Sequence, residues 1–463
     1  MSTVTISDTP FVGNDRLLVG IVLSVLTFWL FAQSVINVVP AMKSSLDISL
    51  ETLTLAVSLS ALFSGCFVVA SGGLADKFGR MRMTTLGLGL SIVGSAMLVV
   101  AQGPGLFLAG RVLQGLSAAC IMPATLALIK TWYEGRARQR AVSFWVIGSW
   151  GGSGLCSFVG GAIATGLGWR WIFVFSIAVA LLALFLLRGT PESRSASASQ
   201  HKLDVGGLLS LIFALVLVNL FISKGHGWGW SSPLSLTMLA GALAAGTIFI
   251  RNGMRKGEAA LIDFALFSNR AYGAAVLSNF LLNGAIGTMM IASIWLQQGH
   301  HLTPLESGMM TLGYLVTVLA MIRVGEKLLQ RYGARLPMMA GPVLTAIAIA
   351  LISCTFLEKA LYIGVVFASN VLFGLGLGCY ATPSTDTAVA NAPENKIGVA
   401  SGIYKMGSSL GGAMGIAVTA SLFTLFLPLG MAHAAQYALW FNAVLCLGAM
   451  TVSALLLPRA SHS

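Results

Sequence analysis

The chain has 463 residues, of which 56% are hydrophobic and only 9% are charged, and its formal net charge is +12. A water-soluble fold needs more polar residues than this to cover its surface, so the composition excludes an ordinary soluble enzyme. It predicts an all-α polytopic membrane protein whose lipid-facing surface is apolar.

Apolar stretches of about 20 residues, the length that crosses a bilayer as a helix, recur along the whole chain. We expect 14 transmembrane helices, and an even number places both termini on one side of the membrane. The helices are expected to begin near Leu17, Leu53, Met83, Leu106, Ala141, Trp171, Leu203, Leu234, Ala271, Pro304, Leu336, Leu361, Ile397 and Gln436.

The basic residues are distributed unevenly between the expected loops. Most of the 27 Lys and Arg residues fall in alternate loops, on the side that also carries the termini. Because positive charge resists translocation, this asymmetry predicts cytoplasmic N- and C-termini. The net charge is therefore a signal of topology and not of nucleic-acid binding. The exceptions are Lys43, Arg170, Lys224 and Lys359 in opposite loops, and Arg111 and Lys405 within helices.

The polar, Ser-rich stretch RGTPESRSASASQHK separates six expected helices from the eight that come after it. The next two helices form a hairpin across KGHGWGWSSP, and a second polar stretch precedes the last six. The predicted architecture is two pseudo-symmetric six-helix bundles with an inserted two-helix hairpin. Its parts are an N-terminal bundle, 1–188, a cytoplasmic linker, 189–202, the transmembrane hairpin, 203–250, a second linker, 251–270, and a C-terminal bundle, 271–463.

Two matching patterns indicate that the bundles repeat each other. KFGRMR follows the second expected helix and RYGARL follows the tenth, with Gly79 and Gly333 in matching places. The fifth and thirteenth helices each carry small residues four apart, which lets helix backbones pack closely in a bilayer. Parallel repeats that move as units around a central site are typical of transporters. The small residues are Gly148, Gly152, Cys156 and Gly160, and Gly407, Gly411 and Gly415.

Four segments resemble a known family. GGLADKFGR, starting at Gly72, resembles the cytoplasmic signature of the major facilitator superfamily, and GRVLQGLSAA, starting at Gly110, is similar to its fourth-helix motif. LIDFALFSNRAYGAA and GWRWIF are similar to segments of its 14-helix drug:proton antiporter branch, in particular the NorC-like multidrug efflux group. The resemblance covers nearly the whole chain and implies drug efflux in exchange for protons.

The charged turn GGLADKFGRMR is interpreted as a conformational latch. Asp76 is expected at the cytoplasmic end of the second helix, where its carboxylate can meet Arg80 or the N-terminal end of a neighbouring helix. The resemblance implies that this neighbour is the thirteenth helix and that the contact closes the cytoplasmic side in the outward-open state. Gly72 and Gly79 permit the tight backbone, whereas the second bundle has Gln330 in place of Asp76. The alternative is an ordinary positively charged loop.

Proton coupling is expected to involve an embedded Arg and an acid. Arg111 lies inside the fourth helix, where a cation costs about 2.5 to 3.5 kcal/mol and needs compensation. The resemblance implies that it exchanges partners with a nearby acid, but Ala32 replaces the family's usual carboxylate. We favour Glu51 or Glu306, at the outer ends of the second and tenth helices, as the proton carrier, with Asp386 as the third choice. The alternatives are a snorkelling Arg111 and acids that only stabilise helix ends.

The fifth helix departs from the family pattern. It carries Cys156-Ser157 where the family has Gly-Pro. Without the proline we expect no kink at this place, and the direction of antiport is less firmly implied.

Polar and aromatic residues on the helices that the fold places centrally predict a substrate cavity. A large apolar pocket with a few hydrogen-bonding groups suits lipophilic compounds of varied shape. For each residue, packing between helices is the alternative, and the amine of Lys405 could instead snorkel to the cytoplasm. The predicted cavity residues are Trp29, Gln33, Asn37, Gln114, Asn279, Asn283, Tyr314, Phe373, Tyr380 and Lys405.

The predicted function is secondary active multidrug efflux: lipophilic, often cationic compounds leave in exchange for protons by alternating access. One alternative is proton-coupled transport of organic anions, because both embedded charges are positive, and another is a sensor or scaffold without transport. No G-x-x-x-x-G-K-[ST] loop or H-E-x-x-H motif occurs, so ATP-driven pumping is not expected. We expect no enzyme activity, no cofactor or metal, no nucleic acid, and a monomer in the bacterial plasma membrane whose partners are drugs, protons and lipid.

Overall fold

The computed structural model describes residues 11–48, 50–195, 204–302 and 304–458. Within these residues every regular element is a helix. Twelve of the helices are long and apolar enough to cross a membrane, or 13 if one bent pair counts as a single span. The all-helical membrane fold is confirmed, and the number of 14 crossings stays a prediction.

The helices that precede residue 188 form one group, which we call the N-half. Its first span is interrupted, since a π-helical turn and a 3₁₀ turn separate two α-helices. The elements are α1 (Asp15–Leu26), η1 (Thr27–Phe31), η2 (Ala32–Ser34), α2 (Val35–Leu46), α3 (Leu50–Phe78), α4 (Arg80–Val100), α5 (Pro104–Trp132), α6 (Gly135–Val146), η3 (Ile147–Gly151), α7 (Gly152–Gly166) and α8 (Arg170–Leu187).

The helices from residue 270 onward form the C-half. The expected helix starts agree with the structure to within three residues in both halves, except that the fifth and fourteenth begin earlier, at Gly135 and Met431. The elements are α11 (Arg270–Gly284), α12 (Gly287–Ile294), η7 (Trp295–Gly299), α13 (Pro304–Met309), α14 (Leu312–Tyr332), α15 (Arg335–Ile352), α16 (Lys359–Ala390), η8 (Glu394–Lys396), α17 (Ile397–Phe426), η9 (Leu427–Leu429) and α18 (Met431–Leu456).

Between the halves, α9 (Val205–Trp228) and α10 (Pro233–Lys256) form a hairpin that packs on itself, and α9 also contacts α3 and α17. Asp204 joins the two ends of the hairpin. Its carboxylate accepts hydrogen bonds from Lys256 Nζ at 2.5 Å and from the backbone N–H of Leu261 at 3.2 Å. Burial acts to raise the pKa of Asp204, but the hydrogen bonds from Lys256 and from backbone N–H groups outweigh it and lower the pKa.

The small-residue ridges pack equivalent helices in the two halves. In the N-half, a Cβ at Gly160 would lie 2.6 Å from Cβ of Ser34, in the first span. In the C-half, a Cβ at Gly411 would lie 2.2 Å from the carbonyl oxygen of Phe280 on α11. The fifth span thus packs on the first as α17 packs on α11, which is the packing that a repeated bundle requires.

Gly415→Ala is expected to destabilise the C-half. A Cβ at this position would lie 2.0 Å from the carbonyl oxygen of Gly284, so α17 and α11 must separate. Overpacking of this kind costs about 1 to 3 kcal/mol, which lowers the Tm by a few degrees. Gly412→Ala is the matched control, because its Cβ would meet nothing closer than 3.9 Å. Thermal unfolding of the two purified variants gives their Tm values. Equal Tm values for Gly415→Ala and Gly412→Ala would contradict this packing argument.

The fifth span is bent by 50° between Gly135–Cys156 and Phe158–Gly166. The expectation that it lacks a kink without the family's proline is therefore wrong. The bend falls at residue 157, within α7, which is rich in small residues; the π-helical turn η3 ends before it, at Gly151. Small residues allow a helix to bend without proline, because they remove side-chain support.

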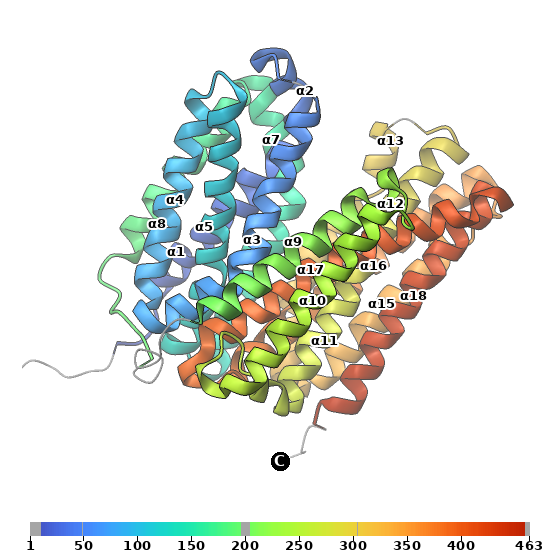
Figure 1. Cartoon of the computed structure of the whole chain (residues 1–463). Helices are drawn as coiled ribbons and strands as arrows, with labels where there is room; N and C mark the ends of the chain where they lie inside the picture. Colours follow the sequence, from blue (N-terminus) through green and yellow to red (C-terminus); the bar gives the residue numbers. More distant parts are fainter. Residues whose placement is uncertain (1–10, 49, 196–203, 303, 459–463) are drawn as a thin grey trace, which may run out of the picture.

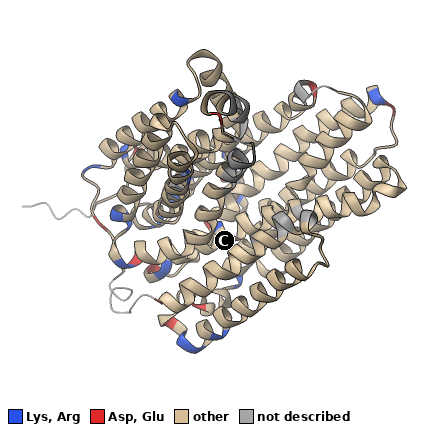
Figure 2. Cartoon of the chain, turned by 45° about the horizontal axis from the view of Figure 1, so that its top comes forward, with Lys and Arg blue, Asp and Glu red and all other residues tan. Residues whose placement is uncertain are grey.

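The N-half and the C-half lie close together at one end of the molecule and diverge toward the other, as Figure 1 shows. At the close end, which we call the latch end, α3 packs on α17, and α6 packs on α14 and α16. The C-terminal mark lies at this end in Figure 1, and the ring of Phe11 contacts Trp132 at the end of α5. Figure 2 shows charged residues mainly near helix ends, with long uncharged stretches between them.

Candidate functional site

A carboxylate at the end of α3 joins the two halves. Asp76 accepts hydrogen bonds from the backbone N–H groups of Gly398 and Val399, at 2.9 and 3.1 Å, in the first turn of α17. N–H groups in a first turn have no partner within the helix, and they attract negative charge. Since Asp76 is only 1% exposed, this contact forms out of water, where charge-assisted hydrogen bonds are strong.

Arg80, one helical turn after Asp76, extends the contact. Its Nη2 lies 3.2 Å from Asp76 Oδ1 and donates to the carbonyl oxygen of Glu394 at 2.9 Å, while Nη1 donates to Thr131 Oγ1 at 2.7 Å. One buried guanidinium therefore binds groups of the N-half and of the C-half. Together, Asp76, Arg80, Thr131 and Glu394 form a connected polar network at the latch end.

Two glycines let α3 and α17 approach at this point. A Cβ on Gly72 would lie 2.2 Å from the carbonyl oxygen of Gly398, and a Cβ on Gly398 would lie 2.2 Å from the carbonyl oxygen of Gly72. At the adjacent Gly73 the nearest atom would be an ordinary 3.5 Å away. Gly79 has a φ of +125°, which side chains other than that of glycine rarely adopt.

Two further contacts join the halves at the latch end. Lys130, on α5, donates to the carbonyl oxygens of Ala390, at 2.9 Å, and of Ala392, at the C-terminal end of α16. Arg138 Nε, on α6, lies 3.0 Å from Asp386 Oδ1 on α16. Asp386, the third choice for the proton carrier, therefore forms an ion pair between the halves in this conformation.

Arg111 is fully buried and joins three spans of the N-half. Its guanidinium donates to the carbonyl oxygens of Ala32 and Ala56, at 2.7 and 2.9 Å, to Gln114 Oε1 at 2.7 Å and to Ser60 Oγ at 2.6 Å. These four acceptors are all uncharged. Where the family pattern has a carboxylate, this chain offers the backbone carbonyl of Ala32 within the 3₁₀ turn η2.

Lys405, on α17, lies between two tryptophans of the N-half. Its Nζ is 5.6 Å from the ring centroid of Trp29, in η1, and 5.1 Å from that of Trp145, in α6. Lys405 is 9% exposed. In this arrangement the amine does not snorkel to the cytoplasm, because cation–π contacts hold it between the halves.

Comparison with known proteins identifies this architecture. Residues 17–260 and 271–463 match the family described as Major Facilitator Superfamily. The chain belongs to the Major Facilitator Superfamily. It is 51% identical over 458 residues to the quinolone resistance protein NorB of Staphylococcus aureus (strain MRSA252), with 99% of each chain covered.

Solved structures show the same superfamily fold. The proton:xylose symporter XylE bound to 6-bromo-6-deoxy-D-glucose has a TM-score of 0.68 at 16% identity, over 96% of each chain. A bacterial homologue of the iron transporter ferroportin in an outward-facing state has a TM-score of 0.66 at 13% identity, over 95% of this chain and 98% of that one. The predicted family, a transporter family, and the likeness to drug-resistance proteins are confirmed.

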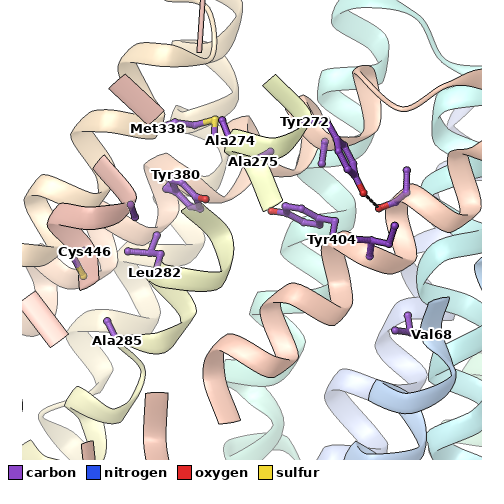
Figure 3. Packing of buried hydrophobic residues seen from close by; sticks show 14 of the residues in the cluster. Val68, Tyr272, Ala274, Ala275, Leu282, Ala285, Met338, Tyr380, Tyr404 and Cys446 are labelled. Atoms are coloured by element: carbon purple, nitrogen blue, oxygen red, sulfur yellow. Dashed lines mark hydrogen bonds between the residues drawn. The ribbon is translucent and has the colours of Figure 1, made fainter. Parts of the chain in front are cut away.

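Several predicted cavity residues make contacts between helices of one half of this superfamily fold. Asn279 Nδ2 donates to Ser408 Oγ at 2.5 Å, which joins α11 to α17, and Asn283 donates to Asn279 Oδ1 at 2.9 Å within α11. The hydroxyl of Tyr380 lies 2.6 Å from Ser278 Oγ. Figure 3 shows Tyr380 and its neighbours packed among these helices. In this conformation Asn279 and Tyr380 bind neighbouring helices, whereas Asn283 binds Asn279 on its own helix.

The remaining predicted cavity residues are placed differently. Tyr314 and Phe373 form an edge-to-face pair with ring centroids 5.7 Å apart. Gln114 binds Arg111, and Gln33 is half-buried in η2. The side chain of Asn37 lies outside the described part of the structure. Of the predicted cavity residues with described side chains, Trp29 and Lys405 are the pair that meets between the halves.

The two favoured acids lie at the ends of their helices. Glu306 is exposed in the first turn of α13. The side chain of Glu51 lies outside the described part of the structure. The four acceptors of Arg111 include neither residue, so the assignment of the proton carrier to one of them stays a prediction.

The contacts of some residues at the latch end could not be predicted from the sequence. Glu192, which the sequence places only in a loop, accepts hydrogen bonds from the backbone N–H groups of Met81 and Arg82, both at 2.9 Å, and so caps α4. The sequence indicates only cytoplasmic positive charges at Lys130 and Arg138. The sequence shows only that Glu192 lies in a short linker after the sixth span. No local pattern predicts which helix its carboxylate caps.

Proposed function

We propose that this chain exports lipophilic, often cationic compounds in exchange for protons by alternating access of its two halves. The observation that carries the proposal is the contact of Asp76 with α17 and of Arg80 with η8, which holds the halves together at one end while they diverge at the other. Such a contact must break for the cavity to open on the other side. A transporter needs this kind of reversible closure.

The class of cargo is inferred from the likeness to the Staphylococcus aureus quinolone resistance protein, which covers nearly the whole of both chains. We infer that quinolones are among the compounds that this chain exports. Aromatic and apolar walls with few polar groups suit such planar, lipophilic compounds.

The topology that goes with this function has 14 crossings, with α9 and α10 as an inserted hairpin and with both termini in the cytoplasm of a bacterial cell. The asymmetric distribution of Lys and Arg supports it. The latch end is then cytoplasmic, and the conformation in the structure is the outward-open one. We propose that the protein acts as a monomer in the plasma membrane.

Proton-coupled transport of organic anions is the second candidate. It is favoured by the charges of Arg111 and Lys405, because neither has a carboxylate partner among the described residues. A buried cation without an acid is suited to receive an anion.

The two candidates are separated in proteoliposomes with an imposed proton gradient. Tetraphenylphosphonium, a permanent cation, is expected to be moved against its gradient, with protons moving in the opposite direction. Movement of benzoate-type anions, but not of this cation, would support the second candidate. Absence of any gradient-driven flux would contradict both.

A further inference from the structure

The surroundings of Lys405 form a defined box for one cation. The indole Nε1 of Trp29 donates to Met122 Sδ at 3.4 Å, and that of Trp145 donates to Thr125 Oγ1 at 2.9 Å. Both anchors lie on α5, so the N-half fixes the two rings, and the amine enters from α17 of the C-half. The faces of aromatic rings attract any cation, whether an ammonium or a lipophilic organic ion.

Helix irregularities place these rings. Trp29 lies in the π-helical turn η1, and Trp145 lies two residues before the π-helical turn η3. Turns of this type interrupt regular helices and occur often at functional sites. The two equivalent interruptions bring Trp29 and Trp145 to α17 from the first and fifth spans.

The box lacks an acid among the described residues. No ion pair joins Lys405 to any of them, and its described contacts are with the two indole rings. Other charged groups on the packed helices have partners of their own or lie at helix ends. They are Asp76 and Lys77 on α3, Arg111 and Lys130 on α5, Arg136, Arg138 and Arg140 on α6, Arg270 on α11, Lys359 and Asp386 on α16, Glu394 and Lys396 in η8 and His433 on α18, with the phenols Tyr380 and Tyr404 on α16 and α17.

We propose that Lys405 carries the exchanged proton and that the Trp29–Trp145 box binds either its ammonium or a cationic substrate, but not both. This deepens the proposed function and depends on it. Two positive charges over the same pair of rings, in a site shielded from water, repel strongly. A lipophilic cation therefore enters only as Lys405 releases its proton.

The exchange balances in charge and atoms. The N–H bond of the Lys405 ammonium breaks, its electron pair stays on Nζ, and the proton goes to water on the side to which the cavity is open. The site then holds the substrate cation over the indoles and a neutral amine. On the other side, a proton from water binds Nζ, and the ammonium displaces the substrate from the box. One cation moves out for each proton moved in.

The test uses the purified full-length chain, with tetraphenylphosphonium as the probe, in weakly buffered detergent solution between pH 6 and 9. The wild type is expected to release about one proton for each cation bound, and to bind about tenfold tighter per pH unit where Lys405 titrates. Lys405→Met should bind the cation with a pH-independent affinity and release no proton. Lys405→Arg should bind at least tenfold more weakly at every pH, since a guanidinium fills the box and keeps its charge.

Lys359→Met, at the exposed start of α16, is the matched control and should behave as the wild type. Glu51→Gln and Glu306→Gln test the competing assignment of the proton carrier to these acids: if Lys405 is the carrier, both variants keep the proton release. Proton release that persists in Lys405→Met, or disappears in one of the Gln variants, would overturn the assignment to Lys405 while leaving proton exchange intact. If the wild type binds the cation without releasing a proton, Lys405 is not the carrier, whatever the variants do. If it neither binds nor transports any cation, the proposed function itself fails.

Discussion

Replacing Asp76 by Asn is expected to lower transport at least tenfold without changing the amount of protein in the membrane. The carboxylate accepts from Gly398 and Val399 and faces Arg80, whereas the amide has one acceptor oxygen and no charge. Hydrogen bonds to a charged group contribute about 1.5 to 3 kcal/mol each. Losing one of them shifts the equilibrium between the two conformations about tenfold or more.

The control for this change is Asp15→Asn. Asp15 also pairs with an Arg, Arg140, at 2.8 Å, but both side chains are largely exposed and such pairs contribute little. Uptake into inverted membrane vesicles measures both variants, with the amount of protein quantified in the same vesicles. An Asp76→Asn rate equal to that of the wild type would remove the latch from the mechanism.

Gly72→Ala is expected to shift the protein away from the conformation described here. Its Cβ would lie 2.2 Å from the carbonyl oxygen of Gly398, and at this distance the backbone must move apart. Moving α3 from α17 also lengthens both hydrogen bonds of Asp76. The state that is closed at the latch end is then disfavoured, so the cavity opens toward the latch end and transport slows.

Gly73→Ala provides a matched control on the next residue, because its Cβ would be 3.5 Å from the nearest atom. Helix propensity changes equally in both variants, which isolates the steric effect. The accessibility of a single cysteine introduced into the cavity at the end opposite the latch end reports the conformation. Equal labelling of the two variants would show that the close approach of Gly72 and Gly398 does not set the equilibrium.

Local sequence patterns place most helix starts and select Asp76 and Arg80, which contact the C-half in the structure. Hydropathy places helix starts because crossing a bilayer demands an apolar length, and the turn around Asp76 stands out by its charges in an otherwise apolar chain. The pairing of Arg138 with Asp386 is not predictable in this way. Those residues are 248 positions apart, and only the packing of the two halves brings them together.

The box around Lys405 shows a second limit. Sequence patterns select Trp29 and Lys405 but not Trp145, which helical spacing does not connect with the cavity. A π-helical turn next to Trp145 adds one residue to a turn of the helix and so rotates the residues on one side of it relative to those on the other. A regular period of 3.6 residues therefore assigns residues to the wrong helix face there.

The most direct measurement is of two distances by electron paramagnetic resonance, with spin labels on a cysteine-free variant that retains transport. One pair joins the halves at the latch end, at the exposed positions Arg82 and Tyr332, and the other joins them at the opposite end, at Leu106 and Phe356. When substrate is added and the pH is changed, the first distance is expected to lengthen as the second shortens. In Gly72→Ala the same change in both distances should occur without substrate. If both distances stay fixed, or if both change in the same direction, alternating access by two halves joined at Asp76 is contradicted.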